Sequence, residues 1–110
     1  MIKVIRNHPT YAVSNFGDVF SITDNGLVEL KKDISTGYPR VKLDGKKEYV
    51  SNLVAQEFMR EPEANQKIFY IDGDKTNCCV ENLIYLTPSE IQFNSHYTIE
   101  YRQQNLRGRA

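Results

Sequence analysis

The chain of 110 residues has few of the features that mark secreted, membrane-spanning or disulfide-bonded proteins. No apolar run approaches the ~20 residues of a transmembrane helix, and no charged-then-apolar leader is evident. The only two cysteines, Cys78 and Cys79, are adjacent. A disulfide between neighbours would be strained, so free thiols in a reducing compartment are expected. We therefore expect a soluble, cytoplasmic protein of one domain, or of one domain with a short appendage.

Metal-ligand spacing is also lacking. The adjacent thiols do not have the Cys-x-x-Cys spacing that lets two sulfurs face one ion, and neither His8 nor His96 lies in a zinc motif. Packing roles are favoured over a zinc site. No cofactor is expected.

Net charge is zero, which is unusual for a protein whose partner is a polyanion, but the charges are unevenly distributed. Residues 1–49 carry eight basic and six acidic side chains, residues 50–100 carry three and eight, and the last ten residues carry three arginines. A nucleic-acid surface is therefore expected in the N-terminal half and the tail, with a solvated hairpin surface as the alternative. The candidate DNA-binding residues are Lys31, Lys32, Arg40, Lys42, Lys46, Lys47, Arg102, Arg107 and Arg109.

The N-terminal half indicates short strands joined by tight turns. Residues alternate between polar and apolar, and Asn25-Gly26 and Asp44-Gly45 are strong hairpin signals. This part is expected to be a β-rich module with two hairpins. Its predicted strands cover residues 18–22, 27–30, 38–43 and 48–50.

The second half predicts two strands between two helices. Ser51 and Asn52 are candidate N-caps for a helix over about 52–59, and strands are expected over 68–71 and 83–86. Thr87-Pro88-Ser89-Glu90 has the pattern of a capping box and predicts a helix running to about residue 104. Its aromatic stripe of Phe93, Tyr97 and Tyr101 favours docking on the core over base stacking.

Five short motifs follow one another in a recognisable order. They are Tyr-Ala-Val-Ser-Asn-Phe-Gly-Asp-Val-Phe-Ser at 11–21, Gly-Tyr with Val-x-Leu at 37–43, Val-Ser-Asn-Leu-Val-Ala with a phenylalanine at 50–58, Ile-Asp-Gly-Asp-Lys-Thr-Asn at 71–77, and Glu-Asn-Leu with Thr-x-x-Glu at 81–90. This series resembles the HNH homing endonucleases with the module that often precedes their nuclease domain. The resemblance implies an α+β fold: an N-terminal β-hairpin module (1–49), a degenerate ββα unit with a C-terminal helix (50–104), and a basic tail (105–110).

The same resemblance assigns the chemical positions. The strand metal ligand falls on Phe69, the histidine general base on Tyr70, and the helix metal ligand on Ile91. Asn82, which orients the histidine in the family, is retained, although it can also serve to tie down the loop. Apolar residues at these positions are expected to fill the emptied cleft. No catalytic residue and no metal ligand is therefore expected.

Two carboxylates remain in the loop that follows the degenerate pair. Asp72 and Asp74 are interpreted as turn chemistry rather than as a metal site, because hard cations need several converging oxygens.

Three functions are compatible with these features. The first is a catalytically inactive protein that binds double-stranded DNA and acts by occupancy, as a repressor or competitor encoded by a phage or mobile element. The alternative is an inhibitor of a host or rival DNA-processing enzyme, using an apolar centre with an acidic rim. The second alternative is a nuclease with a rebuilt active site. No membrane partner is expected.

Overall fold

The computed structural model describes residues 1–93, which form an α+β fold of small antiparallel sheets around a central helix. The first four strands pair in chain order: β1 (Ile2–Ile5), β2 (His8–Ser14), β3 (Val19–Thr23) and β4 (Gly26–Glu29). They are followed by the hairpin of β5 (Arg40–Leu43) and β6 (Lys46–Tyr49) and by the helix α1 (Val50–Phe58). The last part contains β7 (Lys67–Tyr70), the 3₁₀ helix η1 (Val80–Asn82), β8 (Leu83–Leu86) and α2 (Pro88–Phe93).

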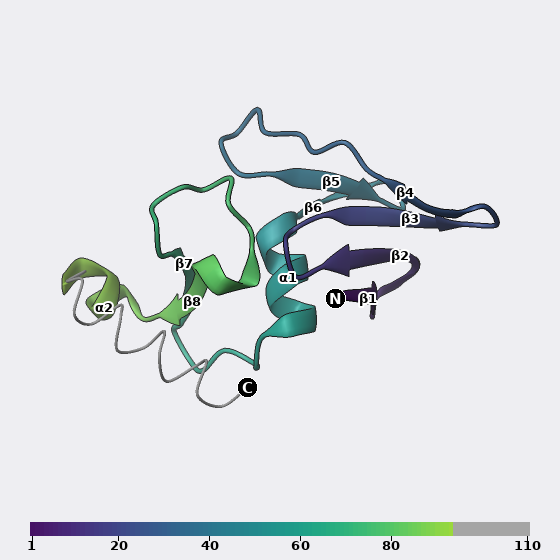
Figure 1. Cartoon of the computed structure of the whole chain (residues 1–110). Helices are drawn as coiled ribbons and strands as arrows, with labels where there is room; N and C mark the ends of the chain where they lie inside the picture. Colours follow the sequence, from purple (N-terminus) through teal and green to yellow (C-terminus); the bar gives the residue numbers. More distant parts are fainter. Residues whose placement is uncertain (94–110) are drawn as a thin grey trace.

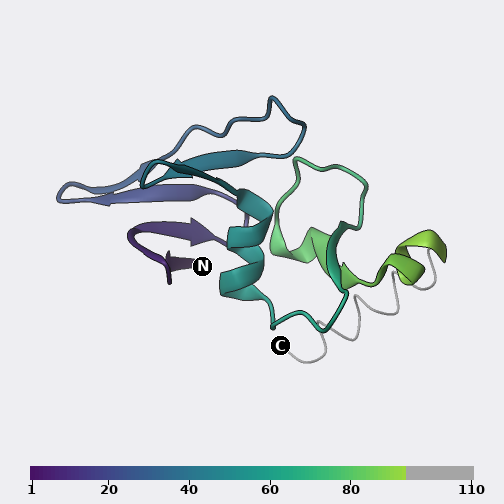
Figure 2. The ribbon, with the colours of Figure 1, turned by 180° about the vertical axis from the view of Figure 1, so that it is seen from behind.

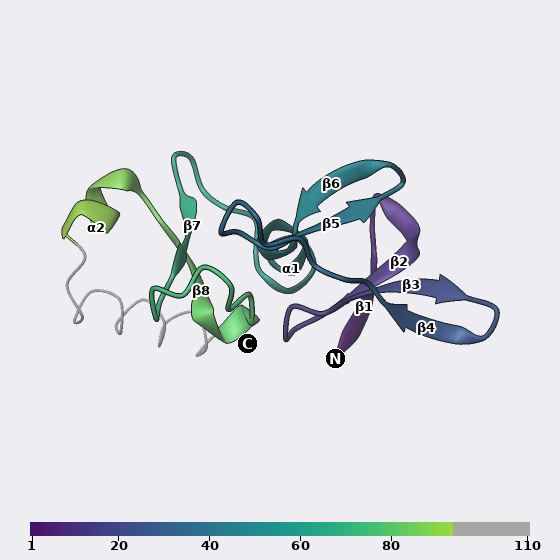
Figure 3. The same ribbon diagram turned by 90° about the horizontal axis from the view of Figure 1, so that it is seen from above.

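The helix α1 lies between two groups of strands (Figures 1 and 2). The β3–β4 and β5–β6 hairpins extend from it on one side, whereas β7, β8 and α2 lie on the other (Figure 3). This arrangement confirms the expected α+β class and the ββα order of the second half. No helix in residues 1–93 is long and apolar enough to span a membrane.

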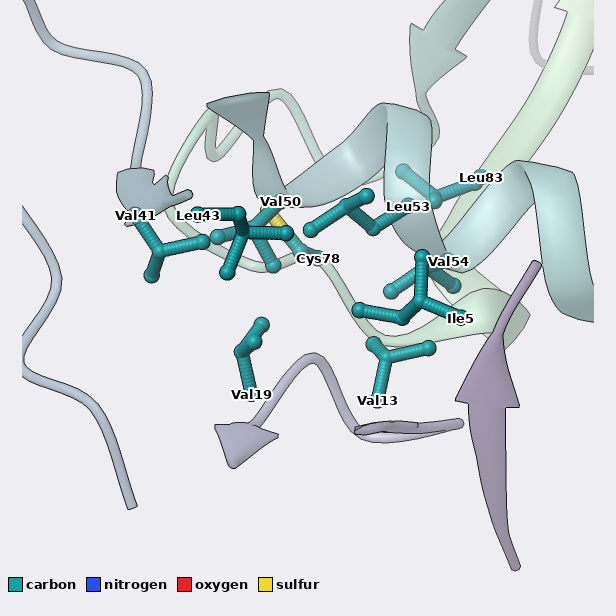
Figure 4. Packing of buried hydrophobic residues seen from close by; sticks show 10 residues of the cluster. All are labelled: Ile5, Val13, Val19, Val41, Leu43, Val50, Leu53, Val54, Cys78 and Leu83. Carbon is teal, nitrogen blue, oxygen red and sulfur yellow. The ribbon is translucent and has the colours of Figure 1, made fainter. Parts of the chain in front are cut away.

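One hydrophobic cluster connects the two groups (Figure 4). Each strand or helix in it contributes its inward-facing apolar side chains, and burial of each such side chain stabilises the fold by ~1.5–3 kcal/mol. The N-terminal module and the ββα unit therefore share a core. The cluster contains Ile5, Val13, Val19, Val41, Leu43, Val50, Leu53, Val54, Cys78 and Leu83.

The start of α1 differs from the prediction. Tyr49 occupies the N-cap position without a side-chain cap bond, and the helix begins at Val50. Val50 is fully buried and Ser51 is 6% exposed, so the first turn is fixed by packing rather than by a polar cap. The prediction that Ser51 or Asn52 caps the helix is therefore wrong. The strand β1 was also not predicted, because three of its four residues are exposed and give no clear alternation.

The predicted capping box of α2 is confirmed. The Thr87 backbone N–H donates to Glu90 Oε1 (2.9 Å), and the Glu90 N–H donates to Thr87 Oγ1 (3.2 Å). The predicted course of this helix to residue 104 lies outside the described residues, as do most of its aromatic stripe and the basic tail. The predictions for Tyr97, Tyr101, Arg102, Arg107 and Arg109 fall in that part of the chain.

The Ser-Asn-Phe-Gly segment of the first motif forms a turn that joins the module to the ββα unit. Ser14 Oγ accepts hydrogen bonds from the backbone N–H groups of Phe16 (3.2 Å) and Asp18 (3.1 Å). The Asn15 carbonyl accepts one from the Val80 N–H (2.8 Å). This motif therefore has a structural role: it shapes a turn and docks it on the β7–β8 loop.

The neighbouring cysteines are free thiols, as expected. Cys78 is buried in the core, and this burial raises the pKa of its thiol to about 11. The Cys78 side chain therefore stays protonated at neutral pH and acts as a small apolar residue.

Candidate nucleic-acid interface

Asn82 organises the long loop between β7 and β8. Its side chain is buried, and its Oδ1 accepts a hydrogen bond from the Asp72 N–H (2.9 Å). Its Nδ2 donates to Asp72 Oδ1 and to the Asn77 carbonyl, both at 2.9 Å. Both the oxygen and the nitrogen of the Asn82 side-chain amide thus hold the loop closed. This geometry gives Asn82 a structural role that needs no neighbouring histidine.

Asp72 and Asp74 are engaged within the same loop. Asp72 accepts hydrogen bonds from the Asn77 side chain (2.9 Å) and the Asp74 N–H (2.7 Å), and these bonds lower the pKa of Asp72. Asp74 Oδ1 accepts from both the N–H and the hydroxyl of Thr76 (2.9 and 2.6 Å). This is the predicted turn chemistry. Within residues 1–93, no three His, Cys, Asp or Glu side chains are grouped so that they could hold a metal ion.

Phe69 and Tyr70 lie on β7, with Phe69 opposite Ile84 and Tyr70 opposite Leu83. Both side chains are partly buried. Burial raises the pKa of Tyr70, and a hydrogen bond with the Ser51 hydroxyl only partly opposes that effect. Neither Phe69 nor a protonated phenol fits a divalent cation, which prefers several charged or carbonyl oxygens.

Phe69 and Tyr70 line an open groove of about 1440 Å³ between α1 and β7. Ile91 does not: it is half-buried on α2, which packs against β8, and it is not among the described residues of the groove. The expectation that all three residues fill one cleft is therefore wrong, because Phe69 and Tyr70 line an open groove and Ile91 lies apart from it. The aromatic residues of the groove are Tyr38, Tyr49, Phe69, Tyr70 and Tyr85.

Basic side chains outnumber acidic ones along this groove. The described lining includes Glu57 and Glu61 as its acidic members. It includes four basic residues, and these are Arg6, Arg60, Lys67 and Lys75. The expected acidic rim is therefore wrong, because the net charge of residues 50–100 does not reveal which face each side chain occupies.

In the β5–β6 hairpin, the pleat of each strand places successive side chains on opposite faces. Arg40 and Lys42 alternate with the buried Val41 and Leu43, so they lie on the outer face. Tyr49 and Lys47 are their cross-strand partners and share that face. We call Arg40, Lys42, Lys47 and Tyr49 the ribbon face. The facing pair of lysines is unfavourable by itself, because like charges directly opposite one another repel.

Asp33 partly neutralises the ribbon face. Its carboxylate pairs with Lys47 and with Arg40 (3.4 Å) and accepts a hydrogen bond from the Ser35 N–H. These contacts, with the Lys47 hydrogen bond foremost, hold the pKa of Asp33 well below its usual range. Lys42 forms no ion pair with any described residue, and its ammonium group remains available to an anion.

The remaining predicted basic residues lie elsewhere. Lys46 is exposed opposite Leu43, on the side of the hairpin away from the ribbon face. Lys32 pairs with Asp18 (3.4 Å), and Lys31 is exposed in the segment after β4. The structure thus brings three of the six predicted hairpin residues onto one face. Sequence reasoning missed Tyr49, although its alternation with Lys47 is a signal for a shared face.

Comparison with known proteins gives two relatives, whereas no family model matches the chain. Over 93 residues the chain is 33% identical to an uncharacterized HNH endonuclease of Acanthamoeba polyphaga mimivirus, covering 78% of this chain and 23% of that protein. A solved structure of DNA binding and cleavage by the HNH homing endonuclease I-HmuI matches with a TM-score of 0.67 and 32% identity, over 98% of this chain and 59% of that one. The chain spans less than two thirds of either relative.

Proposed function

We propose that this chain, a relative of the HNH homing endonucleases in sequence and fold, binds double-stranded DNA and acts by occupying it without cutting it. The observation that carries this proposal is the side chain chemistry of β7. The family resemblance assigns Phe69 and Tyr70, on that strand, to the positions of the metal ligand and the general base. Such a protein would work as a repressor or as a competitor for a DNA site.

The proposed lack of cleavage follows from what the side chains of Phe69 and Tyr70 can do chemically. Phosphodiester hydrolysis in this family depends on a metal ion that stabilises charge and on a base that takes a proton from water. Phe69 has no lone pair to offer a cation. Tyr70 cannot serve as the base at neutral pH, because burial raises its pKa and keeps the phenol protonated. Neither of these two side chains therefore supplies the metal ligand or the base that the resemblance assigns to its position.

The ribbon face supports DNA binding independently of the lost site. A two-stranded antiparallel ribbon fits the major groove of B-form DNA. Lys42 and Lys47 face each other across the strands, an arrangement whose repulsion a bound phosphate would relieve. The exposed ammonium group of Lys42 would release counterions from DNA on binding.

The test is a titration of fluorescent duplex DNA with the purified chain, followed by fluorescence anisotropy from 50 to 300 mM salt. Random and genomic duplexes are both used, because the target sequence is not known. We expect binding at low salt, and the logarithm of the affinity should fall linearly with the logarithm of salt concentration. If no duplex shows a rise in anisotropy on addition of the chain at 50 mM salt, the proposal is overturned.

A further inference from the structure

The groove beside the ribbon face contains aromatic rings from three segments, and two of these rings are exposed. Tyr38 and Tyr49 are 37% and 42% exposed, and their rings meet edge to face with centroids 6.3 Å apart. Tyr70 lies 6.1 Å from Tyr38 at an interplanar angle of 49°. Tyr38 precedes β5, Tyr49 ends β6 and Tyr70 ends β7. We call Tyr38, Tyr49 and Tyr70 the tyrosine cluster.

Cations accompany the rings of this groove. Lys75 Nζ lies 5.0 Å from the centroid of the Tyr38 ring, and the Arg60 guanidinium lies 5.6 Å from that of Tyr85. Lys67 also lines the groove. Aromatic rings next to basic side chains are the combination with which proteins bind single-stranded nucleic acid, since the rings stack on bases and the cations track the phosphates.

The tyrosine cluster continues the ribbon face. Tyr49 is the cross-strand partner of Arg40 and also lines the groove, so DNA held on the ribbon face would reach the groove without a gap. The groove volume of about 1440 Å³ exceeds the ~300–1,000 Å³ of pockets that hold drug-sized ligands. In an intact duplex the base faces are stacked on one another, so rings in this groove can stack only on unpaired bases.

We propose that the groove binds unpaired bases of DNA, which would make the chain prefer a duplex that contains a short unpaired segment. This inference rests on the proposed DNA binding. Tyr38 and Tyr49 stack on the bases, whereas Lys75 and Lys67 contact the phosphates on either side. The ribbon face holds the adjoining paired DNA.

The test compares two fluorescent DNAs of one length, a fully paired duplex and the same duplex with four central mismatches. We expect the wild-type chain to bind the mismatched DNA about tenfold more tightly. Tyr38→Ala should remove most of this preference and leave the affinity for the paired duplex within about twofold, because Tyr38 lies outside the ribbon face. Tyr38→Phe is the matched control, and it should keep the preference because stacking uses the ring and not the hydroxyl.

A charge reversal gives a second route if the alanine variant does not fold, as judged by circular dichroism. Lys75→Glu should weaken binding of the mismatched DNA about tenfold and change binding of the paired duplex much less. Equal wild-type affinity for the two DNAs would overturn this inference and leave duplex binding intact. So would a loss of preference in the phenylalanine control. Absence of binding to either DNA would instead overturn the proposed function.

Discussion

Gly17 packs against Cys78 so closely that a β-carbon on Gly17 would lie 3.0 Å from the Cβ of Cys78 and 3.2 Å from its carbonyl oxygen. Gly17 belongs to the N-terminal module, and Cys78 belongs to the loop between β7 and β8. The hydrogen bond from Val80 to Asn15 lies beside this contact. The contact fixes the module against the ββα unit, and this arrangement sets the ribbon face beside the groove.

Gly17→Ala should therefore lower the free energy of unfolding by about 3 kcal/mol, through backbone strain at φ +90° and overlap with Cys78. Gly45→Ala is the matched control, because Gly45 has a similar φ of +87° but nothing within 4 Å of an added β-carbon. It should cost about 1 kcal/mol. Urea unfolding followed by circular dichroism measures both, and equal losses would show that the Cys78 contact is unimportant.

Asn82→Asp should destabilise the chain at pH 7 by about 3 kcal/mol. The change removes two donated hydrogen bonds and places a carboxylate beside Asp72 Oδ1 and the Asn77 carbonyl. At pH 4 the loss should be smaller, because the introduced carboxyl is partly protonated and can donate again. Melting temperatures at both pH values test this. Asn25→Asp, in an exposed turn, should change little, and a loss that does not depend on pH would contradict the account of Asn82.

Asp33 should contribute to acid sensitivity. Its pKa is lowered in the folded chain by Lys47 and Ser35, so its contribution to stability is present above the unfolded pKa of about 4 and is lost as the pH falls below it. Asp33→Asn should flatten the fall in melting temperature between pH 5 and pH 2. Asp24→Asn, at an exposed turn position, should retain the wild-type slope. Identical slopes for both variants would rule out the Asp33 contacts as a source of acid sensitivity.

Much of the fold could be predicted because its signals are local. Asp44-Gly45 forms the predicted turn between β5 and β6, and Thr87 and Glu90 form the predicted capping box. The β3–β4 turn lies one residue earlier than the Asn25-Gly26 signal, because Asp24 and Asn25 form it and Gly26 begins β4 and pairs with Thr23. The first helix begins at Val50 rather than at about residue 52, because the burial of Val50 outweighs the capping preference of Ser51. The burial of Val50 depends on tertiary packing, so it cannot be predicted from a short segment of sequence.

The site was harder to predict because it is assembled from distant segments. Tyr38, Tyr49 and Lys75 meet only after the module docks on the ββα unit. Lys75 lies in a segment with a strong acidic excess, so segment charge concealed its place in a basic groove. Lys42 and Lys46 were grouped by proximity in sequence, although strand pleating puts them on opposite sides.

This separation of Lys42 and Lys46 gives a matched pair for testing DNA binding. Both lysines are exposed on one hairpin, and neither has an ion pair with a described residue. Lys42→Ala should weaken duplex binding and reduce the slope of log affinity against log salt by about one unit. Lys46→Ala should leave the slope nearly unchanged. The ribbon face would be excluded as the binding surface if the two variants behaved alike in anisotropy titrations.

The most direct measurement is incubation of supercoiled plasmid with excess protein and Mg²⁺ or Mn²⁺, with half of each sample run on a native gel and half deproteinised first. We expect retarded plasmid in the first half and unchanged supercoiled plasmid in the second, since Phe69 and Tyr70 offer neither a metal ligand nor a base. Nicked or linear plasmid that appears with the wild-type chain and disappears with Tyr70→Phe would contradict DNA binding without cleavage.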